Sequence, residues 1–330
     1  MLFIDNKGIV NPKINLAIEE YVLKHLPVDK EDYLLFYINE PSIIIGKNQN
    51  TIEEINTDYV TKNDIHVVRR LSGGGAVYHD LGNLNFSFLT KDDQKSFHNF
   101  SKFTEPVVEA LHQLGVDAKL TGRNDITVND KKISGNAMFA TKGRMFSHGT
   151  LMLESDIERI VSALKVKKEK IESKGIKSIR SRVANINDFL PNKLTMEQFK
   201  QYLLESIFGS KEKITEYVLT EEDWEKIHAI ANERYEQWDW NYGKSPKFNY
   251  IHSKRFPIGS IEVRLEVTKG IIESAKIYGD FFGVGDIKEI EEKLTSIRYD
   301  KNSIEEVLAD VDVSKYFGAI TKEEFIDLLY

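Results

Sequence analysis

The chain has 330 residues, of which 41% are hydrophobic and 29% charged, as in ordinary globular proteins, and its length suggests two domains. The net charge of −7 excludes a global basic field for nucleic acid, and the absence of cysteine excludes a disulfide scaffold, a Cys-ligated zinc site and a thiol nucleophile. No apolar run is long enough for a membrane helix and the first residues lack a signal-peptide pattern, so we expect a cytoplasmic protein without membrane or nucleic-acid contacts.

The first ninety residues predict one helix and then short strands. Asn11 and Pro12 are typical of an N-cap and a first helical position, and the apolar spacing after them predicts a helix over residues 11–26. Runs rich in β-branched and aromatic residues predict strands at 33–38, 42–45, 65–70 and 83–89. The glycine triplet Gly73–Gly75 therefore lies in a loop between strands.

Helices and strands continue to alternate through the middle of the chain. Residues 97–114 predict a helix ended by Gly115, in which Pro106 marks an early break or a first-turn position. The patterns that follow predict strands at 126–128, 132–139 and 148–153, and helices at 155–164, 195–208 and 221–236.

The composition of the sequence changes near WNYGKSPKFNY, residues 240–250, where Gly and Pro suggest a linker. We place a domain boundary near residue 245, which gives domains at 1–245 and 246–330. The second domain is predicted to contain a hairpin over 260–267 and 271–279 and helices at 286–296, 302–311 and 320–329.

The first candidate site is the stretch RRLSGGGAVYH around the glycine triplet. The chain contains neither the G-x-x-x-x-G-K-[ST] pattern of a P-loop nor a G-x-G-x-x-G between a strand and a helix. A glycine loop between strands can still form an anion-binding nest, and Arg70 beside it can clamp a carboxylate or a phosphate. A plain β-turn with incidental charges explains the same letters equally well.

The second candidate site is TGRNDITVNDKKISGNAMF, residues 121–139. Small and polar residues at 134–137 follow Lys132 and leave room for a ligand near its amine. Asp125 could hold Mg²⁺, which takes one or two carboxylates together with substrate phosphates. The alternative is a hairpin with an exposed polar turn, because most lysines lie on the surface.

A basic run and a His-Asp pair need separate interpretations. Residues 165–182 carry eight Lys or Arg and two Glu, a local charge of +6, which suits either a solvated helix face or a loop that binds an anion such as a nucleotide phosphate. His79 and Asp80 are adjacent on a strand-like run and point to opposite faces, so we expect loop support rather than a catalytic relay.

Together these segments resemble the lipoate–protein ligase A family. RRLSGGGAVYHDLGN is similar to the family's lipoate-binding loop, GRNDITVNDKKISGNA to its second signature, HGTLML to its third, and SKGIKSIRSRVANI to its adenylate-binding loop. The resemblance covers the whole chain. It implies an α/β fold, with a catalytic domain of the biotinyl/lipoyl ligase type that has mixed sheets flanked by helices, and a small α/β accessory domain.

The resemblance also implies two half-reactions, in which lipoate and Mg-ATP form lipoyl-AMP and the lipoyl group then passes to a lysine of an apo lipoyl domain. Lys132 is the catalytic residue that it implies. The lipoate site would comprise Arg70, Ser72, Gly74, Gly75, Ala76, Val77, Tyr78, His79, Asn83, Lys132, Ser134, Gly135, Asn136, Ala137, His148 and Gly149. The nucleotide would meet Asn124, Asp125, Lys174 and Arg180, with Asp125 as the Mg²⁺ ligand.

Related activities remain as alternatives. Acyltransferases of this superfamily that work through a cysteine thioester are excluded by the absence of cysteine, and LSGGGAVYH differs from the arginine-rich loop of biotin ligases. An enzyme that transfers only pre-formed lipoyl-AMP, or a non-catalytic protein that binds lipoyl domains, would carry a similar sequence. We expect a monomer whose acceptors are the glycine-cleavage H protein or the E2 subunits of 2-oxoacid dehydrogenases.

Overall fold

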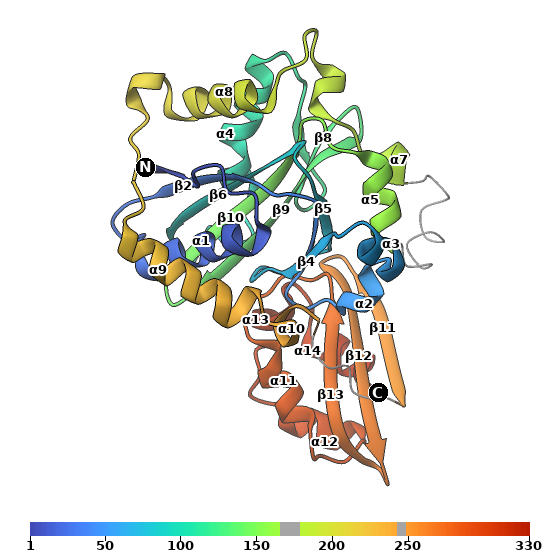
Figure 1. Ribbon diagram of the computed structural model, residues 1–330. Helices are drawn as coiled ribbons and strands as arrows, with labels where there is room; N and C mark the ends of the chain where they lie inside the picture. The colour runs from blue at the N-terminus through green and yellow to red at the C-terminus, as the bar shows by residue number, and fades with distance from the viewer. Residues whose placement is uncertain (166–178, 243–248) are drawn as a thin grey trace.

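The computed structural model describes residues 1–165, 179–242 and 249–330. Within them the chain forms a large mixed sheet, a smaller sheet beside it and a third sheet near the C-terminus, with helices against the sheets (Figure 1). This architecture confirms the predicted α/β fold class with mixed sheets and a small C-terminal α/β unit. No helix in the described part of the chain is long and apolar enough to cross a membrane.

The large sheet has the strand order β1-β2-β6-β10-β9-β8-β7. Only β1 and β2 pair in parallel within it, and the other described neighbours are antiparallel. Its strands are β1 (Leu2–Asp5), β2 (Tyr33–Ile38), β6 (Asn83–Lys91), β7 (Lys119–Thr121), β8 (Asp125–Val128), β9 (Lys131–Thr141) and β10 (Arg144–Met152).

The small sheet carries the glycine loop. Its central strand β3 (Ser42–Ile45) runs parallel to β4 (His66–Arg69) and antiparallel to β5 (Val77–His79). The triplet Gly73–Gly75 connects β4 to β5, so strands flank it as predicted. The loop is thus anchored at both ends in the same sheet, which limits its movement.

Two groups of helices cover the large sheet (Figure 1). Asn11 caps α1 as predicted, because its side chain accepts a hydrogen bond from the Lys13 amide. The helical segments among the described residues 1–165 and 179–242 are α1 (Pro12–His25), α2 (Thr51–Glu54), α3 (Thr57–Lys62), α4 (Phe100–Gln113), α5 (Ile157–Ala163), α7 (Ile179–Arg182), η1 (Ile186–Phe189), α8 (Met196–Phe208), η2 (Lys211–Lys213), α9 (Glu221–Ile230), the π-helical turn η3 (Ala231–Tyr235) and α10 (Trp238–Asn241).

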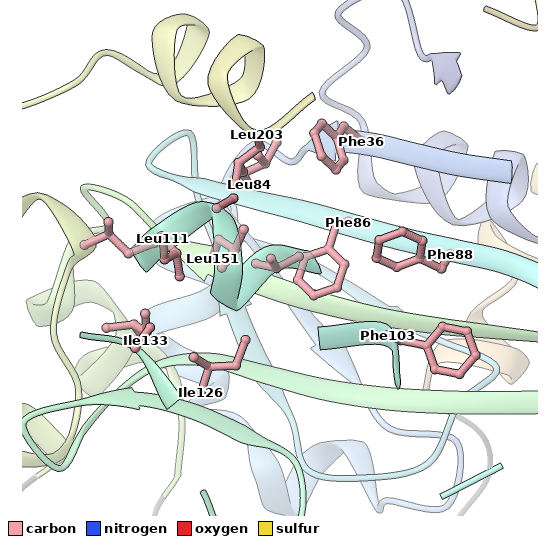
Figure 2. Packing of buried hydrophobic residues seen from close by; sticks show 14 of the residues in the cluster. Phe36, Leu84, Phe86, Phe88, Phe103, Leu111, Ile126, Ile133, Leu151 and Leu203 are labelled. Atoms are coloured by element: carbon pink, nitrogen blue, oxygen red, sulfur yellow. The ribbon is translucent and has the colours of Figure 1, made fainter. Parts of the chain in front are cut away.

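Apolar and polar residues alternate along β6, so the two faces of the large sheet have different surroundings. Leu84, Phe86 and Phe88 pack into the hydrophobic cluster under α4 and α8 (Figure 2). Asn85 and Ser87 point to the opposite face, where they are buried although they are polar. A polar row on a buried face indicates that this side of the sheet lines something other than a closed apolar core.

The structure corrects the expectation for Pro106, which lies inside α4 and neither breaks the helix nor starts it. A proline at such a position removes one backbone hydrogen bond and crowds the preceding turn. The buried face of α4, with Phe103, Val107 and Leu111, packs into the main hydrophobic cluster. Tertiary packing of this kind outweighs local propensity.

The C-terminal part has its own hydrophobic cluster, which draws its buried members from residues 256–329. The predicted hairpin is present and is joined by Lys269 and Gly270, both with positive φ. A further edge strand, β11, was not predicted. The elements are β11 (Tyr250–Phe256), β12 (Gly259–Thr268), β13 (Ile271–Gly279), α11 (Ile287–Leu294), α12 (Lys301–Val307), α13 (Val313–Phe317) and α14 (Lys322–Leu329).

We predict that Phe86→Ala lowers the free energy of unfolding by about 3–5 kcal/mol, since it empties a fully buried aromatic position in the middle of β6. Urea unfolding followed by circular dichroism measures the change. Val218→Ala is the matched control, because Val218 is 58% exposed and its truncation should change stability by less than about 0.5 kcal/mol. Equal effects of the two substitutions would contradict the assignment of this core.

Candidate active site

A cavity lies between the α1 face of the large sheet, the small sheet and one aromatic side chain of the C-terminal part. Asn85, from the polar row of β6, is one of its lining residues. Its walls are formed by Leu16, Tyr37, Ile44, Arg70, Gly74, Gly75, Ala76, Val77, His79, Asn85, Asn124, Lys132, Gly135, Asn136, Ala137, His148, Gly149, Thr150 and Phe282.

Most of the site residues predicted from the sequence line this cavity, whereas Ser72, Tyr78, Asn83, Asp125 and Ser134 do not. Tyr78 packs in the cluster on the far face of the small sheet, because successive residues of β5 point to opposite faces. The others contact lining residues: Asn83 donates to Asn85 Oδ1, for example, at 3.0 Å. Ser72, Asn83 and Ser134 are buried and therefore support the walls of the cavity from behind, whereas Asp125 lies at its open end beside Lys132.

Two predicted nucleotide contacts are not placed. Lys174 lies outside the described residues. Arg180 belongs to the short helix α7, whose backbone is described, but the position of its side chain is not.

Sequence reasoning missed Leu16, Tyr37, Ile44, Asn85, Thr150 and Phe282. The first three are apolar and read as ordinary core residues from their spacing. Asn85 did carry a signal, because the alternation of residues 83–89 places it on the face opposite Leu84 and Phe86. Phe282 lies far along the chain, and only the tertiary fold brings it to the cavity.

The three glycines have different surroundings. A Cβ at Gly73 would lie 2.4 Å from the Phe281 carbonyl oxygen. Gly74 has a φ of +89°, and a Cβ there would lie 2.8 Å from the Phe282 ring. A Cβ at Gly75 would meet nothing within 4 Å, although Gly75 lines the cavity. The first two glycines therefore serve backbone packing, and the third leaves space open beside the cavity.

Arg70 is 5% exposed, and its guanidinium is committed to the protein. Nη2 donates to the carbonyls of Gly73 and Gly75 at 2.6 and 2.9 Å, Nη1 to that of Ile44 at 3.0 Å, and Nε to Ser72 Oγ at 2.9 Å. Burial lowers the pKa of Arg70 to about 10, which still leaves it charged at neutral pH. The side chain thus holds the glycine loop in shape instead of extending toward a ligand as a free clamp.

A buried relay continues from Arg70 to α1. Ser72 Oγ lies 2.8 Å from His148 Nε2, and His148 Nδ1 lies 2.9 Å from Glu19 Oε1. Glu19 is 2% exposed, so its carboxylate is available only to such internal partners. The relay connects α1, β10 and the glycine loop beneath the cavity, and it fixes the orientation of the His148 ring in the cavity wall.

Lys132 lies where the cavity meets solvent. Its Nζ lies 2.8 Å from Asp125 Oδ1, and the two side chains are 36% and 40% exposed. A Cβ at Gly135 would lie 2.8 Å from this Nζ, so the glycine leaves room for the lysine to reach across the strand. Because exposed ion pairs are weak, an arriving anion can draw Lys132 away from Asp125.

Asn124 and Asn136 fix the position of that lysine strand. Asn136 Nδ2 donates to the Asn124 backbone carbonyl at 3.0 Å, and Asn124 Nδ2 donates to the Asn136 backbone carbonyl at 2.5 Å. The turn before β8 is therefore bound to the middle of β9. The GRND segment has a positional role, which is independent of any contact that it makes with a nucleotide.

Asp80 supports the chain after β5, as predicted. Its carboxylate accepts hydrogen bonds from the amides of Gly82 at 3.0 Å and Asp156 at 2.8 Å. His79 faces Asn39 instead, so the pair does not form a relay.

The C-terminal part closes over the mouth of the cavity. The Gly74 amide donates to the Phe281 carbonyl at 3.4 Å, so this amide of the predicted anion nest is engaged. The Phe282 ring lies 5.9 Å from the Phe100 ring, and the Arg123 guanidinium carbon lies 4.4 Å from the Phe282 ring centre. These contacts connect the two parts of the chain directly at the site.

The charges at the mouth do not form a ready-made metal cage. Within residues 1–165, 179–242 and 249–330, no group of three or more His, Asp or Glu side chains is placed to hold a metal ion. A single carboxylate at the mouth, Asp125, is nevertheless what a magnesium ion bound mainly by substrate phosphates requires.

The site thus combines a buried, largely apolar interior with a lysine at its open end. A cavity of this kind can take an acyl group whose carboxylate reaches the lysine. The family model of the lipoyl protein ligase A/B catalytic domain matches residues 11–208, and that of the bacterial lipoate protein ligase C-terminus matches residues 245–329. The chain belongs to the lipoate–protein ligase family, which confirms the resemblance in its motifs.

Similar proteins agree over the full length. The lipoate-protein ligase LplJ of Bacillus subtilis is 68% identical and lipoate–protein ligase 1 of Staphylococcus aureus is 57% identical, each over 100% of both chains. The crystal structure of P. falciparum LipL1 in complex with lipoate has a TM-score of 0.79 at 28% identity, and covers 99% of this chain and 96% of that one. Lipoate-protein ligase A bound with ATP has a TM-score of 0.60 at 30% identity, with coverages of 71% and 94%.

We predict that alanine at Gly74 and at Gly75 has opposite consequences. Gly74→Ala should lower the free energy of unfolding by about 1–3 kcal/mol, because its backbone is left-handed and its Cβ would meet Phe282. Gly75→Ala should leave stability within about 0.5 kcal/mol but weaken binding of the acyl substrate, because its methyl group takes up space beside the cavity. Thermal unfolding and isothermal titration calorimetry separate the two effects, and a reversed order would contradict this interpretation of the loop.

Proposed function

We propose that the chain activates free lipoate with Mg-ATP to lipoyl-AMP and then transfers the lipoyl group to a lysine of an apo lipoyl domain. The observation that carries the proposal is the position of Lys132, at the open end of a cavity whose interior is buried. An acid bound with its chain inside presents its carboxylate to this amine. The family membership and the two complexes among the similar structures, one with lipoate and one with ATP, support the same substrates.

In the first half-reaction a carboxylate oxygen of lipoate attacks the α-phosphorus of ATP. The new bond is a carboxylic–phosphoric anhydride, and the bond to pyrophosphate breaks. Negative charge gathers on the α-phosphate oxygens, where a fixed cation stabilises it. We assign this role to Lys132. Its amine would move from its ion pair with Asp125 to the acyl oxygen and the α-phosphate.

This movement releases the Asp125 carboxylate, which is the group we propose for Mg²⁺. The other ligands of the ion would include phosphate oxygens of ATP. The ion would neutralise charge on the departing pyrophosphate. We further propose that Lys174 and Arg180, in the basic run 165–182, contact the adenylate.

In the second half-reaction the ε-amine of the acceptor lysine attacks the acyl carbon of lipoyl-AMP. An amide bond forms, the anhydride bond breaks, AMP leaves, and the amine loses a proton. Because the adenylate is already an activated acyl group, the enzyme needs no nucleophile of its own, which suits a chain without cysteine. Positioning and charge stabilisation are sufficient.

The acceptors we propose are the glycine-cleavage H protein and the E2 subunits of 2-oxoacid dehydrogenases. A similar solved protein, at 33% identity and a TM-score of 0.65, is described as an archaeal bi-partite lipoate protein ligase with its E2 lipoyl domain. We also propose that the enzyme acts in the cytoplasm as a monomer, with a catalytic unit at 1–245 and an accessory unit at 246–330.

The test is lipoate-dependent exchange of labelled pyrophosphate into ATP, followed by mass spectrometry of a panel of apo acceptor domains. Exchange together with a lipoyl mass gain on an acceptor supports both half-reactions. Transfer from synthetic lipoyl-AMP without any exchange would replace the proposal by a transfer-only enzyme. Absence of both reactions would leave a protein that only binds lipoyl domains.

We predict that Lys132→Ala lowers the exchange rate by about 100-fold or more, since it removes the cation that faces the developing charge. Lys131→Ala is a matched control, because Lys131 is the adjacent residue of β9 but is exposed and does not line the cavity. It should keep the rate within about twofold. Near-normal exchange by the Lys132 variant would show that another group stabilises the α-phosphate.

A further inference from the structure

His79 lines the cavity and carries a polar atom that no described protein group uses. The residue is 4% exposed, sits on β5 and lines the cavity. Its Nε2 is buried and has no hydrogen-bond partner among the described residues. Since a buried polar atom without a partner is costly, a ligand atom is the natural candidate to satisfy it.

A chain of asparagine side chains decides what kind of atom this is. Asn15 Nδ2 lies against the carbonyl oxygens of Ile9 and Ile38 at 2.9 and 3.1 Å, which can only accept, so the amide end of Asn15 is fixed. The same Nδ2 lies 2.9 Å from Asn39 Oδ1, so its two N–H groups are shared among three acceptors. An Asn39 amide turned the other way would set two donors against each other, so Asn39 Nδ2 is the group that faces His79 Nδ1, also at 2.9 Å. Because Nδ1 accepts, the ring proton of neutral His79 is on Nε2, and the ring nitrogen without a described partner is a donor.

The ring is also held neutral. Burial is the largest cause that lowers the pKa of His79, to about 3, and the nearby charges of Arg70 and His148 act in the same direction. The imidazole therefore offers one N–H and no net charge at any ordinary working pH. Such a group can donate one hydrogen bond to an uncharged acceptor of a ligand.

The position of His79 in the cavity, relative to Lys132, determines which part of the substrate lies beside it. Its partner Asn39 follows β2 directly, and β2 is separated from the lysine strand β9 by β6 and β10. Three strand spacings of about 4.8 Å separate the backbones of β2 and β9 by roughly 14 Å. His79 is 4% exposed and the Lys132 side chain 36%, so His79 lines the buried part of the cavity and Lys132 its open end. An acid whose carboxylate reaches Lys132 thus places the far end of its chain near His79.

We infer that the His79 Nε2–H donates a hydrogen bond to a ring sulfur of lipoate, and that it makes the site prefer lipoate over acids of similar shape without sulfur. The inference rests on the proposed function. The dithiolane ring lies at the end of lipoate opposite its carboxylate, and divalent sulfur is a weak acceptor. A hydrocarbon chain in the same place leaves the donor buried without a partner.

The experiment compares lipoate with 5-cyclopentylpentanoate, in which two CH₂ groups replace the two sulfurs of an otherwise similar ring, and with octanoate. We expect pyrophosphate exchange by the unaltered enzyme to favour lipoate over the cyclopentyl acid by about tenfold in kcat/KM, within the range for one buried unpaired donor. In His79→Phe the preference should fall to about twofold or less. Ile44→Val, which alters the same cavity without touching a donor, should change all three acids by a common factor.

A nuclear magnetic resonance measurement on the unaltered, ¹⁵N-labelled protein keeps the inference testable even if His79→Phe does not fold. We expect the His79 proton on Nε2 before ligand is added, and a shift of the Nε2 resonance with lipoate but not with the cyclopentyl acid. A proton on Nδ1, equal shifts with both acids, or an unchanged preference in His79→Phe would overturn the inference. Absence of exchange with every acid would instead overturn the proposed activation, while the resonance shift would still decide the role of His79.

Discussion

The buried guanidinium of Arg70 is the constraint on which the site depends. A charge removed from water must be satisfied by the protein, and three backbone carbonyls and one hydroxyl supply the partners for Arg70. Two of those carbonyls belong to the glycine loop, which therefore cannot relax without exposing an unpaired cation. The loop that first reads as flexible is in this way held by a buried side chain at the carbonyls of Gly73 and Gly75.

The strength of the local pattern determined which elements could be predicted from the sequence. The helix after Asn11 could be predicted from its N-cap and its apolar spacing, and strand β6 from its alternation of apolar and polar residues. β11 escaped prediction, because it is an edge strand with mostly exposed residues and no apolar alternation, and β7 is only three residues long. Such strands form because a neighbouring strand offers free backbone groups, which a local sequence pattern does not record.

Some residues of the candidate site could likewise be predicted from the sequence, and others could not. The motifs located most of the lining residues, because glycines, small residues and charges crowd together there for chemical reasons. Leu16, Tyr37 and Phe282 were missed, since an apolar residue next to a ligand reads like one next to a core. Even for Arg70, the sequence predicted the presence of charge but not that its donors are used up by the backbone.

The two ends of the cavity are built on different physical principles, and this difference suits the proposed sequence of steps. At the inner end, buried networks that include Glu19 with His148 and Asn39 with His79 are costly to break, so the surface that reads the acyl chain is organised before binding. At the mouth, Lys132 and Asp125 form an exposed pair that an anion can separate at little cost. Recognition of the acid is thus rigid, while the groups that act on its carboxylate are free to change partners.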